Sequence, residues 1–323
     1  MPISFRTGPV SVRTPATSAN LGPGFDALGL ALTLYDEVTA EVVDGETTVE
    51  VAGEGEGTLP ANEDHLVVRA MRRTFEILGG QPKAIRLRCV NAIPQARGLG
   101  SSSAAIVAGV TLAQALSGMW DRERALEIAG ELEGHPDNVA PCILGGFTIA
   151  WLDPAGDQAL AEPGVKPGRK ARATALTPHP DVQPVVFVPP TQGLTAAARA
   201  ALPKQVPHHD AAFNAGRSAL LVHALTNDPS LLLAATEDRL HQDYRAPGMP
   251  ETAALVGRLR ASGIAAVVSG AGPTVLALTK LGDMPENIAN AAGETSDAPG
   301  KTSAEGWVRH KLRFDLVGAA FVE

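Results

Sequence analysis

A short loop rich in glycine and serine is the strongest chemical signal in the sequence. It reads Pro94-Gln95-Ala96-Arg97-Gly98-Leu99-Gly100-Ser101-Ser102-Ser103-Ala104. The alternating run 85–90 before it predicts a strand, and the small apolar residues after it predict a helix that ends near residue 116. The first N–H groups of a helix are unpaired and carry partial positive charge, and glycine lets the backbone approach an anion closely. The pattern therefore predicts a phosphate-binding loop.

Two common nucleotide-binding loops do not fit this segment. The Gly-Lys-Ser/Thr ending of a Walker A loop is absent, and so is the GxGxxG spacing of a dinucleotide-binding turn. A flexible linker is also a poor interpretation, because an unbroken helical stretch begins directly at Ala104.

Three further segments carry polar side chains suited to a small substrate. These side chains are Asn20 and Asp26 in 15–26, Glu133 and Asn138 in 133–141, and Thr195, Arg199 and Arg245 in the second half. Thr195 and Arg199 are four residues apart in a predicted helix, so both point to the same side. A carboxylate suits an ammonium group, and a guanidinium suits a carboxylate or phosphate.

The elements that must position these groups are a mixture of strands and helices. Strands are predicted at 10–13, 37–43 and 47–51 (as a hairpin), 85–90, 145–151, 182–188, 265–269 with 274–278, and 308–314, and helices at 64–78, 104–116, 123–132, 194–202, 211–224 and 250–262. The Gly- and Pro-rich block 15–32 predicts an ordered loop that enters a short helix or strand, and residues 135–142 a turn that caps a short helix. A segment rich in Pro, Gly and charge, 153–172, predicts a boundary between domains 1–155 and 156–323, and the polar stretch 286–305 predicts a mobile region.

Bulk composition excludes several function classes. A formal net charge of -8 argues against nucleic acid as the main partner, because such a surface repels phosphate backbones. With 45% hydrophobic residues the chain can bury a large core, yet no run is long enough to cross a membrane. Two cysteines without metal-ligand spacing and an N-terminus without an apolar signal segment favour a reducing, cytoplasmic setting.

The loop at 94–104 resembles the ATP-binding motif of the GHMP kinases (galactokinase, homoserine kinase, mevalonate kinase and phosphomevalonate kinase), and the match is complete. The resemblance extends over most of the chain. It implies a two-domain α+β fold, with an N-terminal half like domain 2 of ribosomal protein S5, a ferredoxin-like C-terminal half, and a site in the cleft between them. It also implies ATP as phosphoryl donor, with nucleotide contacts along the whole loop.

The segment 15–26 is similar to the version of the family's N-terminal motif found in homoserine kinases, which implies L-homoserine as the small-molecule substrate. The resemblance places the substrate against Asn20, Asp26, Asn138, Thr195, Arg199 and Arg245, with Asn138 and Arg199 as the catalytic residues. It implies Mg²⁺ bound by Glu133 and Ser101. Glu131 is an alternative ligand, and the choice among the three serines stays open.

Some relatives carry an aspartate where this sequence has Asn138, whose amide cannot take a proton at neutral pH. We therefore expect no dedicated catalytic base, and we interpret His135 as structural. The glycine motif 268–274 is expected to pack beside the phosphate loop. For the adenine pocket only Asn62 and residues 90–92 stand out by position.

Other functions remain open at this point. A GHMP kinase for mevalonate or a sugar is one, and a non-catalytic nucleotide sensor on the same fold is another. A homodimer is compatible with the family, and neither the oligomeric state nor inhibition by threonine follows from the sequence.

Overall fold

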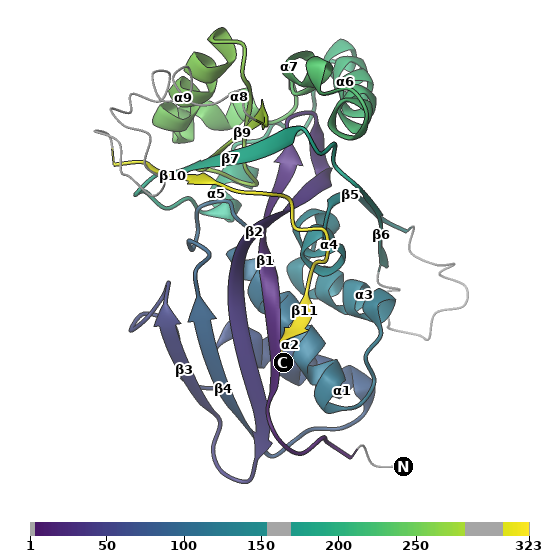
Figure 1. Ribbon diagram of the computed structural model, residues 1–323, viewed down its shortest axis with the longest axis vertical. Coiled ribbons are helices and arrows are strands. Elements are labelled where there is room, and N and C mark those ends of the chain that lie inside the picture. Colours follow the sequence, from purple (N-terminus) through teal and green to yellow (C-terminus); the bar gives the residue numbers. More distant parts are fainter. Residues whose placement is uncertain (1–3, 154–168, 282–305, 323) are drawn as a thin grey trace.

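The computed structural model describes residues 4–153, 169–281 and 306–322. Within them the chain forms two β-sheets, each covered by helices (Figure 1). The predicted domain boundary between residues 155 and 156 and the polar stretch 286–305 lie outside the described residues. No helix in the described ranges has the length and apolar character that a bilayer span requires.

The larger sheet has seven strands and contains the two longest strands of the described chain. Its order is β11-β1-β2-β4-β3, and β5 joins β2 to β6. The strands are β1 (Val10–Leu21), β2 (Gly24–Val43), β3 (Thr48–Gly53), β4 (Ala84–Asn91), β5 (Phe147–Leu152), β6 (Ala171–Leu176) and β11 (Ala320–Val322). Strands β6 and β11 lie beyond the predicted boundary in sequence, yet they pair within the sheet of the N-terminal half.

Two expectations for this sheet are wrong. The runs 37–43 and 47–51 do not form a hairpin, because β2 pairs with β4 and β3 lies parallel to β4 on its far side. Most of block 15–32 is strand rather than loop, since β1 and β2 meet in a tight turn at Gly22. Alternation indicates that a segment is a strand, but it does not specify the partner.

Helices α1 (Leu66–Leu78), α2 (Ser101–Leu116), α3 (Arg122–Glu133) and α4 (Pro136–Leu144) cover one face of this sheet (Figure 1). Small residues let α1 and α2 approach closely. A Cβ added at Gly109 of α2 would lie 2.5 Å from the carbonyl oxygen of Val67 in α1. Helix α1 ends at Gly79, which adopts φ 89° and donates its N–H to Glu76 O, a typical glycine stop.

The second sheet has four strands in the order β10-β7-β9-β8. These are β7 (Val182–Val188), β8 (Ala265–Val268), β9 (Val275–Lys280) and β10 (Val308–Lys311), accompanied by α5 (Thr195–Ala200), α6 (His208–Thr226), α7 (Leu232–Ala235), α8 (Gln242–Arg245) and α9 (Pro250–Ala261). Alternate residues of β7 face opposite sides: Val185 and Phe187 pack in a small cluster with α9, whereas Val186 joins the main core. The predicted strand pair around 265–278 is confirmed and is antiparallel, and β10 lies at the edge of the sheet.

Candidate active site

The phosphate loop lies where the two halves meet. It connects β4 to α2, and Gly100 caps the helix with φ 71° and no side-chain hydrogen bond. A cavity of about 380 Å³ opens against Gly98, Gly100 and the three serines that follow. The N-terminal end of α2 therefore presents its main-chain N–H groups to the cavity, as an anion site requires.

Close packing explains both glycines of the loop. A Cβ added at Gly98 would lie 2.2 Å from Ser269 O, and one added at Gly100 would lie 1.9 Å from Thr17 Oγ1. Ser269 Oγ in turn donates to Gly98 O over 2.7 Å. The loop is thus held between β1 and the glycine motif that follows β8, and the expectation that this motif packs beside the phosphate loop is confirmed.

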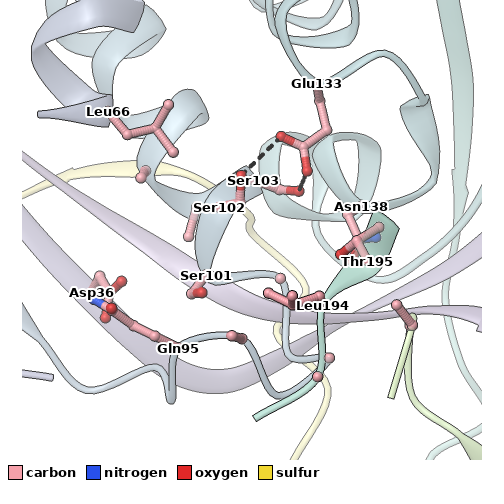
Figure 2. A pocket seen from close by; sticks show the side chains of 18 of the residues that line it. Asp36, Leu66, Gln95, Ser101, Ser102, Ser103, Glu133, Asn138, Leu194 and Thr195 are labelled. Atoms are coloured by element: carbon pink, nitrogen blue, oxygen red, sulfur yellow. Dashed lines mark hydrogen bonds between the residues drawn. The ribbon is translucent and has the colours of Figure 1, made fainter. Parts of the chain in front are cut away.

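Glu133 reaches the start of α2 from the end of α3. Ser103 Oγ donates to Glu133 Oε1 over 3.0 Å, and Ser102 Oγ donates to Oε2 over 3.2 Å (Figure 2). Glu131 does not line the cavity and forms an ion pair of 2.9 Å with Arg73 of α1. Of these two glutamates, Glu133 is therefore the one that lines the cavity. Ser101 also lines the cavity, but its hydroxyl makes no hydrogen bond to Glu133.

A second group of charges lies across the cavity from the serines. Arg199 of α5 binds the carboxylate of Asp26 with both Nη atoms, at 2.7 and 3.2 Å. Asp26 lies just after the β1–β2 turn with φ 53°, and its N–H donates to Asn20 Oδ1, whose own φ is 56°. Asn20 and Asp26 are non-glycine residues in the left-handed region and are joined by a hydrogen bond. Such strained backbone conformations are typical of functional sites.

Asn138 lies near the N-terminus of α4, between these two groups. Its Oδ1 accepts from Thr17 Oγ1 over 2.8 Å, which fixes the amide and leaves Nδ2 as a donor beside the cavity. His135 precedes it and binds the buried carboxylate of Asp137 through Nδ1 over 2.8 Å. The hydrogen bond with Asp137 raises the pKa of His135 above its ordinary value, so the imidazolium form is favoured.

Arg245 is buried and still lines the cavity. Its Nε donates to Ala198 O and its Nη1 to Gly270 O, at 3.2 and 3.3 Å, while Nη2 makes no hydrogen bond to another described residue. Its guanidinium also lies 5.3 Å from the ring centre of Phe25. Burial lowers the pKa of Arg245, although a guanidinium stays charged at neutral pH. An anion in the cavity would meet a fixed, partly desolvated cation here.

Most residues predicted from the sequence meet at one cavity. Its lining includes Asn20, Gln95, Ala96, Gly98, Gly100, Ser101, Ser102, Ser103, Ala104, Glu133, Asn138, Thr195, Arg199 and Arg245. Asp26 lines an adjoining cavity that shares His135 and Arg199 with the first. Pro94, Arg97 and Leu99 belong to the loop but do not line the main cavity.

Sequence reasoning missed the end of the cavity that lies away from the acceptor groups. Leu59, Leu66, His65 and Asp36 line it. Of the positions noted for an adenine pocket, Asn91 lines the cavity and Asn62 does not. An acidic residue on the inward side of β2 was the one available signal for Asp36.

His65 and Asp36 are both buried at this end of the cavity. His65 Nδ1 accepts from Val67 N, so Nε2 carries the proton in the neutral ring, and Nε2 has no hydrogen-bond partner within the described ranges. Burial lowers the pKa of His65 and keeps the ring neutral. Asp36 Oδ1 accepts from the N–H groups of Ala92 and Ile93, and burial raises its pKa to about 6.

Comparisons with known proteins agree with this arrangement. Residues 65–146 match the family model of the GHMP kinase N-terminal domain, and residues 219–297 match that of the GHMP kinase C-terminal domain. A homoserine kinase of Streptomyces avermitilis is 52% identical over 321 residues, which cover 98% of this chain and 97% of that protein. A homoserine kinase of Clavibacter michiganensis is 48% identical and covers 96% and 93% of the two chains.

Solved structures extend the comparison to the fold. The homoserine kinase of Cytophaga hutchinsonii superimposes with a TM-score of 0.78 at 25% identity over the full length of both chains. A mevalonate kinase structure at 12% identity and a TM-score of 0.62 shares the fold alone. The two-domain α+β fold expected from the sequence is thus confirmed, and the chain belongs to the GHMP kinase family, within its homoserine kinases.

Proposed function

We propose that this chain transfers the γ-phosphoryl group of ATP to the side-chain hydroxyl of L-homoserine, giving ADP and O-phospho-L-homoserine, a step of threonine biosynthesis. One observation supports this most strongly. A single cavity joins the start of α2 and Glu133 on one side to Asn138, Arg199 and Arg245 on the other. A nucleotide phosphate and an amino-acid hydroxyl can therefore meet inside it.

The nucleotide is assigned to the α2 side. The main-chain N–H groups at Gly100 and the following serines would hold the phosphates, and the apolar side chains of Leu59 and Leu66 would enclose the base. His65 Nε2–H has no partner among the described residues, so a ring nitrogen of the purine is the acceptor that fits it.

Glu133 with Ser102 and Ser103 fits a magnesium ion. Mg²⁺ prefers oxygen ligands, takes few from the protein, and completes its shell with phosphates and water. The carboxylate and hydroxyl oxygens meet within 3.2 Å of one another at the end of the phosphate loop. When bound, the ion would neutralise phosphate charge that develops during transfer. This geometry favours Ser102 or Ser103 over Ser101 as the serine beside the ion.

The substrate amino acid is assigned to the opposite side. The Asp26 carboxylate suits the ammonium group, the free Nη2 of Arg245 suits the α-carboxylate, and Asn138 Nδ2 can donate to the hydroxyl oxygen. A sugar or mevalonate carries no ammonium group that could take the place of Arg199 on the Asp26 carboxylate. This charge pattern favours an amino alcohol over the alternative substrates of the family.

The transfer itself needs positioning and positive charge more than a base. Phosphoryl transfer passes through a loose transition state in which the attacking hydroxyl is deprotonated late. Asn138 cannot accept the proton, and His135 Nδ1 is already bound to the carboxylate of Asp137. Arg199 lies close enough to the acceptor groups to stabilise charge on the transferring group once Asp26 turns to the substrate.

A coupled assay of ADP release against a panel of amino alcohols, sugars and mevalonate tests this proposal. We expect turnover with L-homoserine at least a hundredfold above the other acceptors, and a product that carries a phosphate ester on the side chain. Turnover of mevalonate or a sugar instead would overturn the substrate assignment. Nucleotide binding without turnover of any acceptor would favour the non-catalytic sensor. A homodimer and a cytoplasmic location stay predictions of the sequence.

A further inference from the structure

Arg97 lies inside the phosphate loop, yet it does not line the cavity. Its guanidinium turns away and binds main-chain carbonyl oxygens with all three nitrogens. Nε donates to Pro189 O over 3.0 Å, Nη2 donates to Pro190 O over 2.9 Å, and Nη1 donates to Gln95 O over 2.9 Å. No carboxylate of the described residues forms an ion pair with it. The guanidinium of Arg97 therefore holds three main-chain carbonyl groups in place, and its charge is not neutralised by an ion pair.

The two proline carbonyls belong to the segment 189–194, which connects β7 of the C-terminal half to α5. A further hydrogen bond joins this segment to the loop, from Gly193 N to Ala96 O over 2.7 Å. Gly193 is also confined on the other side, since a Cβ there would lie 2.9 Å from the Pro273 ring. Segment 189–194 is therefore fixed to the phosphate loop at two points, and Arg97 supplies the outer one.

The attachment of segment 189–194 to the phosphate loop matters because this segment leads into α5. It runs directly into α5, where Thr195 and Arg199 face the acceptor side of the cavity. Leu194, at its end, lines the same cavity with 72% of its surface exposed. The phosphate loop sets where the γ-phosphate lies, and α5 sets where Arg199 lies. Arg97 connects the two through its hydrogen bonds to Pro189 O and Pro190 O, and its third bond, to Gln95 O, stays within the loop.

We propose that Arg97 is a positioning residue that sets the distance between the phosphate loop and Arg199, and so acts on phosphoryl transfer through Arg199. This inference rests on the proposed function. A misplacement of about 1 Å at a reacting centre can cost about a hundredfold in rate. Loss of Arg97 should therefore lower kcat more than it weakens nucleotide binding, because the guanidinium does not touch the cavity.

The test compares three variants with the wild-type chain. We expect Arg97→Ala to lower kcat roughly ten- to hundredfold, while the Kd of a non-hydrolysable ATP analogue changes by less than about threefold. Arg97→Lys keeps the charge but cannot bind three carbonyls, so it should behave like Arg97→Ala. Recovery of kcat by lysine would show that charge, not geometry, is what Arg97 supplies, and would overturn the proposal. If Arg97→Ala does not fold, Arg97→Lys and Arg97→Gln carry the same comparison.

A double-mutant cycle separates action through Arg199 from general weakening of the fold. If Arg97 acts through Arg199, the Arg97→Ala/Arg199→Ala variant should be no more than about twofold slower than Arg199→Ala alone. If instead the loss of kcat in the double variant equals the product of the losses in the two single variants, the proposal is contradicted. Arg72→Ala is the matched control, because Arg72 also binds a proline carbonyl and several other groups but lies on the far side of α1. It should lower the melting temperature and leave kcat unchanged.

Failure of this inference and failure of the proposed function give different results. Absence of homoserine turnover in the wild-type chain contradicts the function. Normal turnover in the wild-type chain with multiplicative effects in the cycle contradicts only the role of Arg97.

Discussion

The two ends of the cavity are prepared for their ligands in opposite ways. At the nucleotide end several donors lack a partner: the main-chain N–H groups at the start of α2 are not capped by a side chain, and His65 Nε2 is buried and unpaired among the described residues. At the acceptor end the charges already satisfy one another, as in the Arg199–Asp26 and His135–Asp137 pairs. One end is ready to bind, whereas the other must first exchange partners.

This difference suggests an order of events. A nucleotide can enter its end at little cost, because it satisfies groups that are otherwise unpaired. In the proposed reaction the amino acid would separate Asp26 from Arg199, and its ammonium group would replace the guanidinium on Asp26. Arg199 would thereby be released toward the phosphates. Partner exchange at the acceptor end would thus couple substrate binding to stabilisation of the transferring group.

The largest loss of activity is expected from a substitution at Gly100, where the phosphate loop is most closely packed. Gly100→Ala would place a Cβ 1.9 Å from Thr17 Oγ1 and disturb its hydrogen bond to Asn138. We expect kcat/KM to fall by about a hundred- to a thousandfold, because phosphate loop and Asn138 are both displaced. The control is Gly118→Ala, which has a similar φ of 68° but open space around an added Cβ. Gly118→Ala should cost about 1 kcal/mol of stability and no activity.

Kinetics and thermal melting of both glycine variants check this prediction. Equal losses of activity in the two variants would show that backbone strain alone, rather than the contact with Thr17, is what matters at Gly100.

The second effect concerns partner exchange at the acceptor end. Asp26→Asn keeps an oxygen acceptor but removes the charge that holds Arg199 and would hold the ammonium. We expect KM for L-homoserine to rise by one to three orders of magnitude, with a much smaller change in KM for ATP. Steady-state kinetics with each substrate varied in turn measures both. An unchanged KM for homoserine would remove Asp26 from the substrate site.

A matched control for the acceptor end is Glu237→Gln. Glu237 pairs with Arg217 over 2.7 Å at the surface of the C-terminal half, with exposure similar to that of the Asp26–Arg199 pair. Surface pairs of this kind contribute little to stability. Its loss should leave both KM values within about twofold of wild type.

The features that could be predicted from the sequence are those encoded by residues close together in the chain. The phosphate loop is continuous in the chain, and its glycines and serines carry the signal themselves, so both its place and its helix were predictable. Arg199 and Thr195 lie one helical turn apart, and that spacing survives in any fold that keeps α5. The family resemblance then joined segments that no local rule could bring together.

Long-range pairing accounts for what was missed. The choice between Glu131 and Glu133 depends on which side of α3 faces α2, and Glu131 proves to face Arg73 on α1. His65 enters the cavity because α1 packs on α2, and Asp36 enters because β2 pairs with β4 rather than with β3. Neither the packing of α1 on α2 nor the pairing of β2 with β4 can be predicted from the hydrophobic periodicity of one segment.

The third prediction concerns the unpaired donor at the nucleotide end. His65→Ser retains an oxygen that can cap α1, as His65 Nδ1 does for Val67 N, but removes the buried, unpaired Nε2–H. We expect the Kd of ATP to rise about five- to tenfold, the scale of one hydrogen bond to a buried group. Calorimetric titration measures the Kd, and circular dichroism checks that α1 is intact.

Nucleotides that lack single ring nitrogens sharpen the His65 prediction. The 1-deaza, 3-deaza and 7-deaza analogues of ATP each remove one possible acceptor. The analogue that weakens binding to the wild-type chain should bind His65→Ser with no further loss, since donor and acceptor form one interaction. Equal binding of all three analogues by the wild-type chain would assign the base to another contact.

The smallest effect on activity, and a distinct effect of pH, is expected at Asp36. Burial raises the pKa of Asp36 from its ordinary value of 3.8 to about 6, so the folded state holds a proton that the unfolded chain has already released between these pH values. Stability contributed by this proton is present below pH 4 and is lost as pH rises through 6. A shift of this size corresponds to at most about 3 kcal/mol.

Asp36→Asn keeps an oxygen for the N–H groups of Ala92 and Ile93 and abolishes the titration. The free energy of unfolding of the variant relative to wild type should therefore increase between pH 4 and pH 7, and stay constant above pH 7. Urea unfolding across this range measures the difference, and a value independent of pH would place the Asp36 carboxylate in contact with water. Near neutral pH the buried Asp36 carboxylate destabilises the fold, and it lies in the same cavity as the unpaired His65. Destabilising groups of this kind are typical of ligand-binding sites. At the acceptor end, by contrast, the carboxylates of Asp26 and Asp137 are each paired with a basic side chain.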